Sequence, residues 1–170
     1  ASYCSPEKAK EYRAQGLTAK EVKEKGCSAE TMKAAGYTAK ELKDAGFSAA
    51  ELKNSGFSAK DLESAGFTAA QMKGAGFSTK DLIGAGYSPR ELRRAGVSAG
   101  GLLANGISPK DLLAAGFSAK ALQNAGVTTQ DLKAAGAAGK GTGAVGLDPG
   151  TKSGGDGRCT VDSAKQMIAK

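Results

Sequence analysis

This 170-residue chain contains no histidine, the commonest acid–base and metal-binding side chain. The residues that could do chemistry are therefore its lysines, its carboxylates and its three cysteines. One segment, Gly139-Lys140-Gly141-Thr142, has the residue types of a phosphate-binding loop. The flanking strand, the full glycine spacing and the following helix of such a loop are missing, so we interpret the segment as part of a linker. Without histidine, a zinc site would need more clustered cysteines or carboxylates, and we expect no metal and no cofactor.

Carboxylates recur at one position of a ten-residue spacing, which could suggest paired acid and base groups. Catalysis would require carboxyls with shifted pKa values in contact with a substrate, and nothing in the sequence shifts these. Their spacing instead follows a structural repeat, and we expect no enzymatic activity. The residues concerned are Glu41, Glu51, Asp61, Asp81, Glu91, Asp111 and Asp131.

Glycine recurs every ten residues from Gly16 to Gly136 without a gap. From Gly16 to Gly126, an apolar residue follows each glycine, then serine or threonine, then usually alanine or proline. A leucine, methionine or valine stands five residues after the first apolar position. A fixed period of this kind is typical of repeat architectures, in which each unit packs on its neighbours.

Residues 47–56 illustrate what one unit predicts. Ser48 is placed as an N-cap and Glu51 three residues later, which is a capping box. Gly56 is placed to end the helix in a left-handed conformation. We expect helices of seven or eight residues and the same capping role for six serines: Ser48, Ser58, Ser78, Ser88, Ser108 and Ser118.

The fold class that follows is all-α, a solenoid of short capped helices with a ten-residue repeat. Pro89 and Pro109 directly follow capping serines, where the first position of a helix tolerates proline. The alternative is a pentapeptide-type right-handed β-helix, since apolar residues also recur every five residues. That fold would bury Lys60, Lys80 and Lys110, at several kcal/mol for each unpaired charge.

Four segments are expected along the chain. Residues 1–16 form an N-terminal cap helix, and residues 17–136 form the helical repeat array. Residues 137–158 are glycine-rich and are predicted to be a linker. Residues 159–170 match the start of the chain in residue types and are predicted to begin a second cap helix and repeat block.

The net charge of +7 comes largely from two rows of lysines along the repeats. Such rows could follow a phosphate backbone, but the aromatic residues occupy core positions and acids are interleaved. We therefore interpret both rows as a solvated face and expect no nucleic-acid partner. Ile83, Leu103 and Leu113 replace lysine in the last-turn row, which indicates either a partner-contact patch or a locally wider core.

Cys4 and Cys27 stand where an aromatic residue precedes the helix cap in other units. They are either apolar filling or a disulfide between the cap helix and the array, the latter requiring an oxidising surrounding.

Residues 35–48, together with Cys4 and the segment Gly26-Cys27-Ser28-Ala29, resemble the decapeptide-repeat region of the DotG/IcmE proteins of type IVB (Dot/Icm) secretion systems. The resemblance implies a periplasmic segment of an inner-membrane-anchored cell-envelope complex. It implies other core-complex proteins as partners, a homo-oligomer in the full assembly, and membrane contact only through regions outside this fragment.

The resulting functional hypothesis is a structural spacer or scaffold segment of a bacterial type IV secretion apparatus, spanning the periplasm as a repeat rod. The alternatives are a solenoid protein-binding module and, less favoured, a basic nucleic-acid-binding array.

Overall fold

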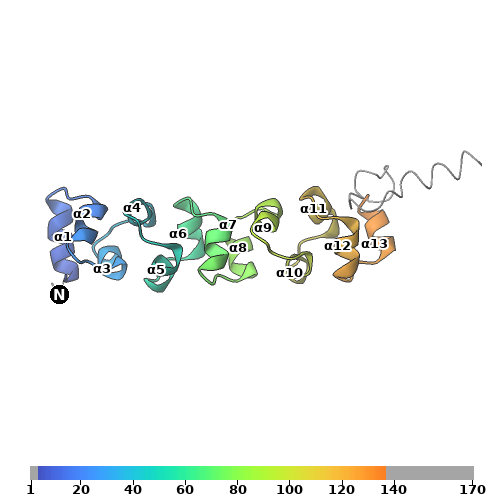
Figure 1. Ribbon diagram of the computed structural model, residues 1–170, viewed down its shortest axis with the longest axis horizontal. Helices are drawn as coiled ribbons and strands as arrows, with labels where there is room; N and C mark the ends of the chain where they lie inside the picture. The colour runs from blue at the N-terminus through green and yellow to red at the C-terminus, as the bar shows by residue number, and fades with distance from the viewer. Residues whose placement is uncertain (1–3, 137–170) are drawn as a thin grey trace, which may run out of the picture. The chain divides into compact units, whose positions relative to one another are not determined.

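The computed structural model describes residues 4–136, and every regular element among them is an α-helix. Figure 1 shows these helices following one another, each joined to the next by a tight turn. The all-α solenoid of short capped helices is thereby confirmed, and the β-helix alternative is wrong. The predicted linker 137–158 and the predicted second cap helix 159–170 lie outside the described residues.

The thirteen helices are α1 (Pro6–Ala14), α2 (Ala19–Glu24), α3 (Ala29–Ala34), α4 (Ala39–Asp44), α5 (Ala49–Asn54), α6 (Ala59–Ser64), α7 (Ala69–Gly74), α8 (Thr79–Ala85), α9 (Pro89–Arg94), α10 (Ala99–Ala104), α11 (Pro109–Ala114), α12 (Ala119–Asn124) and α13 (Thr129–Ala134). Most contain six residues, so the expected seven or eight was too long for all but α1 and α8. The difference arises because the residue before each glycine acts as the C-cap.

Each helix begins at a hydroxyl residue that accepts a backbone hydrogen bond. Ser48 accepts from the N–H of Glu51 (3.1 Å), and the Glu51 carboxylate accepts in return from the N–H of Ser48 (2.7 Å). All six predicted serine caps accept such a bond, although Ser108 and Ser118 lack the reciprocal half. The caps satisfy donors that a helix end would otherwise leave unpaired.

Each helix ends at a glycine with positive φ. Gly56 has a φ of 89°, which a residue with a side chain rarely adopts. This turn lets the N–H of Phe57 donate to the carbonyl of Leu52 (3.1 Å) and the N–H of Gly56 donate to that of Lys53 (3.0 Å). These two bonds define a Schellman ending, as the sequence predicted.

The chain divides into two compact units, Ala1–Ala95 and Gly96–Lys170. In the first unit, each helix packs on the helix two places along the chain, from α1 on α3 to α7 on α9. Alternate helices therefore form two columns, which we call the odd column (α1, α3, α5, α7, α9) and the even column (α2, α4, α6, α8). In the second unit, α10 packs on α12 and α11 on α13. One turn of the solenoid thus contains two repeats, or twenty residues.

The core is a narrow line of one large side chain per helix. The residue at the fourth position of each short helix is fully or almost fully buried, and the alanines and aromatic residues beside it are mostly buried. The fully buried members of this line are Val22, Met32, Leu42, Leu52, Leu62, Met72, Leu82, Leu92, Leu102, Leu112 and Leu122. No charged or polar residue of the described segment joins them.

Leu112→Ala should lower the stability of the second unit by roughly 2–5 kcal/mol, because it removes a fully buried side chain and leaves a cavity. Leu113→Ala is the matched control, since Leu113 is only half-buried and should cost clearly less. Hydrogen exchange across α10–α13 measures both changes, which are expected to be local because repeat arrays unfold progressively. Equal losses of protection in the two variants would contradict the assigned core.

Candidate functional site

The last-turn lysines of the first unit connect successive turns of the solenoid. Lys33, Lys43 and Lys53 each donate from Nζ to the carbonyl of a glycine 23 residues later, at 3.0, 3.0 and 2.8 Å. Each acceptor glycine lies just beyond the end of a helix two places along, where carbonyls lack helical partners. Lys23 makes a similar, longer bond to the carbonyl of Ala45 (3.5 Å).

The same cations lie over aromatic rings 24 residues later. Distances from the cationic group to the ring centroid are 4.5–5.4 Å for the lysines and 4.6 Å for Arg13, within the range of cation–π attraction. We call these contacts the cation ladder. Its pairs are Arg13 with Tyr37, Lys23 with Phe47, Lys33 with Phe57, Lys43 with Phe67, and Lys53 with Phe77.

The interpretation of the last-turn lysines as a solvated face was incomplete, because Lys23, Lys33, Lys43 and Lys53 also donate to a carbonyl one turn away. Their charged groups contact the next turn of the solenoid. Lys53, for example, donates to the carbonyl of Gly76 just after α7, rather than to a carbonyl of its own helix. The sequence showed the lysines and the aromatic residues. It did not show which lysine contacts which ring, because a ten-residue period does not indicate which units pack against each other.

The ladder changes at Glu63, which stands where the four preceding helices, α2 to α5, have lysine. Lys60 takes over part of the role, donating from Nζ to the carbonyl of Ala85 (3.1 Å) and pairing with Glu63 (3.2 Å). The C-terminus of α8 thus still receives a cation. The aromatic residue 24 positions after Glu63 is Tyr87, whose hydroxyl donates to the carbonyl of Phe67. Burial raises the pKa of Tyr87 to about 12, so the hydroxyl keeps its proton at neutral pH.

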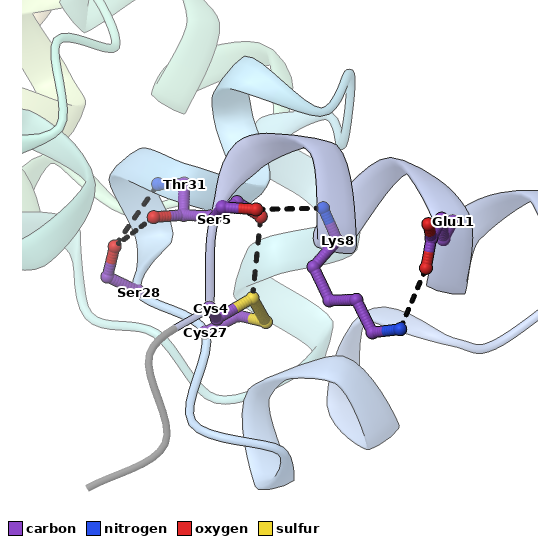
Figure 2. Close-up of a disulfide and its surroundings, with 7 residues drawn as sticks. All are labelled: Cys4, Ser5, Lys8, Glu11, Cys27, Ser28 and Thr31. Atoms are coloured by element: carbon purple, nitrogen blue, oxygen red, sulfur yellow. Dashed lines mark hydrogen bonds and ion pairs between the residues drawn. A yellow bond between two sulfur atoms is a disulfide. The ribbon is translucent and has the colours of Figure 1, made fainter.

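Cys4 and Cys27 are joined by a disulfide, with their Cα atoms 5.0 Å apart. Figure 2 shows that the two cysteines precede the N-cap residues Ser5 and Ser28, so the bond ties the start of α1 to the start of α3. The sequence left this pairing open against simple apolar filling, and the structure contains the bond. Cys159 lies outside the described residues.

The disulfide occupies a position where other turns use a hydrogen bond. The hydroxyl of Tyr37 donates to the carbonyl of Leu17 (3.3 Å), twenty residues earlier, again joining the residues that precede two caps in one column. Cys4 and Cys27 are 23 residues apart. The three extra residues arise because α1 has nine residues where the next helices have six.

The recurring carboxylates are held by the caps. Hydrogen bonds from the backbone and side chain of Thr18 lower the pKa of Glu21, and bonds from the side chain and backbone of Ser78 lower the pKa of Asp81. Such groups remain ionised at neutral pH, which does not suit a general acid. Within residues 4–136, no group of histidine, cysteine and carboxylate side chains could hold a metal ion.

Ile83, Leu103 and Leu113 are each half-buried. Ile83 belongs to α8 of the first unit, whereas Leu103 and Leu113 lie on α10 and α11 of the second, which are consecutive helices and not stacked partners. The three residues are therefore divided between the two units. A role in partner contact stays a prediction for each of them.

Shallow grooves lie between stacked helices of the first unit. One groove of about 460 Å³ contains Ala50, Phe67 and Gly74, and a second of about 480 Å³ contains Ala70, Tyr87 and Arg94. Smaller grooves of about 320 and 290 Å³ contain Lys40 and Phe57, and Glu30 and Asn54, respectively. The grooves recur with the repeat. All four are open to solvent, so none of them encloses a small molecule on all sides.

Every helix between residues 4 and 136 is too short, and too polar, to cross a bilayer.

These features define a class of protein, a helical solenoid of short capped helices in which a row of cations connects successive turns of the first unit. A model of the decapeptide repeat region matches residues 8–79 and again residues 66–148, together more than half of the chain. The chain therefore belongs to the decapeptide repeat family, and it is a repeat structural segment. Among curated proteins and solved structures, none matches it significantly.

Lys53→Met should destabilise the first unit by about 1 kcal/mol, because it keeps the apolar stem but removes the bond to Gly76 and the contact with Phe77. Lys40→Met is the matched control, since Lys40 pairs only with Asp44 on its own helix. Denaturation followed by circular dichroism compares the two variants. If Lys40→Met costs as much as Lys53→Met, the ladder has no special role in stability.

Proposed function

We propose that this chain is a structural spacer or scaffold segment of a bacterial type IV secretion apparatus of the Dot/Icm kind. The observation that supports this most directly is the match to the decapeptide repeat region, a family found in DotG/IcmE proteins. The sequence resemblance of residues 35–48 points to the same proteins. By this proposal the segment has no catalytic role, and its partners are other core-complex proteins and further copies of itself.

The architecture supports a spacer because each turn is built in the same way. A helix of six residues is far below the roughly 12–15 residues needed for a marginally stable free helix, so each depends on its stacked neighbours. The buried line of large apolar side chains continues through every short helix, and the cation ladder repeats from α1 to α5, so adding such units extends the array without a new kind of contact. Length is then the property that the repeats determine.

The disulfide supports a periplasmic location. Such bonds persist in oxidising compartments such as the bacterial periplasm and are rare in the cytosol. The bond also ties α1 to α3, the next helix in its column.

A nucleic-acid-binding array receives less support. The ring of Phe67 is 5 % exposed and that of Phe47 is 7 % exposed, which leaves little surface for bases to stack on. The last-turn lysines are already engaged in the cation ladder. Interleaved acids at the caps further reduce the positive field.

The spacer role can be tested by changing the length of the array in the full protein of the bacterium that carries it. Removing residues 37–56, one complete turn, should reduce effector export, and removing residues 37–76 should reduce it further. Inserting unrelated repeats with the same caps and leucines should restore export. Normal export by the shortened proteins, with normal protein levels, would exclude a spacer.

The compartment can be tested by thiol trapping in a Cys159→Ser background. Cys4 and Cys27 should resist alkylation in cells that carry the periplasmic thiol oxidase and become reactive in cells that lack it, because the bond forms only under oxidising conditions. Mass spectrometry of the alkylated peptides gives the oxidised fraction. A Cys27→Ser variant, in which Cys4 must be reactive in both strains, controls for access of the reagent. Full alkylation in the wild-type strain would argue against the periplasm.

A further inference from the structure

The two units bury the same kind of apolar core but differ in how the starts of their helices are held. In the first unit, seven helices begin with a reciprocal capping box, namely α2 and α4 to α9. Among the described helices of the second unit, α10 to α13, none has one. Gly101 and Ala121 stand at the third position of α10 and α12, where neither side chain can accept a hydrogen bond. The Asp131 carboxylate accepts from the hydroxyl of Thr128 (2.7 Å) rather than from its N–H. The helix starts of the second unit therefore have only one half of the bond pair that a capping box provides.

The polar contacts between turns also differ between the units. The fifth position of the helix supplies the ladder cations of the first unit, and in α10, α11 and α12 it holds Leu103, Leu113 and Gln123. Lys133 on α13 is charged, but the ring position 24 residues later falls outside the described residues. Among residues 96–136 no ion pair joins two side chains, whereas such pairs occur in the first unit. The apolar core of the second unit is thus not supplemented by the cation contacts that connect the turns of the first.

The space that a ladder cation occupies in the first unit is open in the second. A Cβ added to Gly76 would lie 3.2 Å from Nζ of Lys53, because this cation closely approaches the turn after α7. A Cβ added to Gly126, the residue 23 positions after Leu103, would meet no atom within 4 Å. Helix α10 packs on α12 as α5 packs on α7, so a cation at position 103 would lie within reach of the Gly126 carbonyl.

Helix α10 contains two glycines that its backbone conformation does not require. Gly100 and Gly101 stand at its second and third positions, and neither is among the glycines with positive φ. A Cβ added to Gly100 would meet the Cβ of Ala125 at 3.8 Å, which is an ordinary van der Waals contact. Glycine is a poor helix former because its backbone loses the most conformational freedom on folding. Two glycines in a helix of six residues therefore favour the open chain.

We propose that the second unit is the compliant part of the array, in which α10 to α13 open at a lower load than the helices of the first unit. In a repeat array the least stable units open first, since stability is a sum of local contributions. Four ten-residue repeats follow Gly96 and end at Gly136, and an open chain of that length reaches roughly 130–145 Å. Opening therefore makes this part of the chain extensible. The first unit, with its disulfide and its cation ladder, stays folded and keeps its length.

Hydrogen exchange of the full chain, measured by mass spectrometry, tests the order of opening. A Cys159→Ser background prevents intermolecular disulfides. Backbone amides of α10 to α13 should exchange about tenfold faster, or more, than those of α5 to α9. The change should be a step between α9 and α10, because α9 has a capping box and α10 has none. Equal protection in the two units, or a gradual rise from α9 to α13 of the kind that simple fraying gives, would overturn the proposal.

The cause of the weakness is tested by restoring one kind of polar contact at a time. Leu103→Lys with Val127→Phe supplies a cation and a ring at the ladder spacing, and Leu103→Met with Val127→Phe is the matched control without the charge. The charged variant should slow exchange across α10 to α13 by about fivefold relative to its control, through one hydrogen bond and one cation–π contact. Gly101→Glu compared with Gly101→Ala isolates the capping carboxylate in the same way. If neither comparison slows exchange while circular dichroism shows the same helix content, the proposal is wrong.

Compliance itself is measured by pulling the same full chain from its two ends in optical tweezers. The first opening events should release roughly forty residues in total, the length of the four repeats of the second unit. Leu103→Lys with Val127→Phe should raise the force at which these events occur, and Lys53→Met in the first unit should leave that force unchanged. First events that respond to Lys53→Met and not to the changes in α10 and α12 would overturn the proposal. The order of opening is a property of this chain alone, so these measurements and the export assays succeed or fail separately.

Discussion

The constraint on which this structure depends is the shortness of its helices. Six residues, closed by a glycine at positive φ, form too few backbone hydrogen bonds to be stable alone. Every helix must therefore be covered by others, and in the first unit the cover comes from the next helix along its column. The buried line of leucines supplies the apolar contact. The cation ladder adds a polar contact, since each lysine satisfies a carbonyl at the end of a helix one turn away.

The disulfide and the tyrosine hydrogen bonds follow the same geometry as the ladder. All join positions one turn apart in a column, and the 23-residue spacing of Cys4 and Cys27 differs from twenty only because α1 is longer. Residue types that suggested chemistry are thus engaged in folding. Carboxylates at the third helix position cap the helices, and hydrogen bonds hold the pKa of Glu21 and Asp81 low.

The second position of each helix differs between the two columns of the first unit, where the core positions do not. It holds lysine in each of the four even helices, and Glu30, Ala50, Ala70 and Arg90 in α3, α5, α7 and α9. The variation is invisible when the repeats are aligned at ten residues, because that alignment mixes the two columns. It becomes apparent only when the repeats are grouped in pairs.

The sequence by itself determined where each helix begins and, to within one or two residues, where it ends, since caps such as Ser48 with Glu51 and stops such as Gly56 act through bonds between residues at most five apart. It also indicated the buried positions, because leucine recurs at one place in each unit. Only the tertiary structure decided which units touch. Nearly identical repeats give no signal that distinguishes a neighbour ten residues away from one twenty away, so the columns and the cation ladder could not be predicted. The pairing of Cys4 with Cys27 was one of two readings until stacking of α1 on α3 brought their Cα atoms within 5.0 Å.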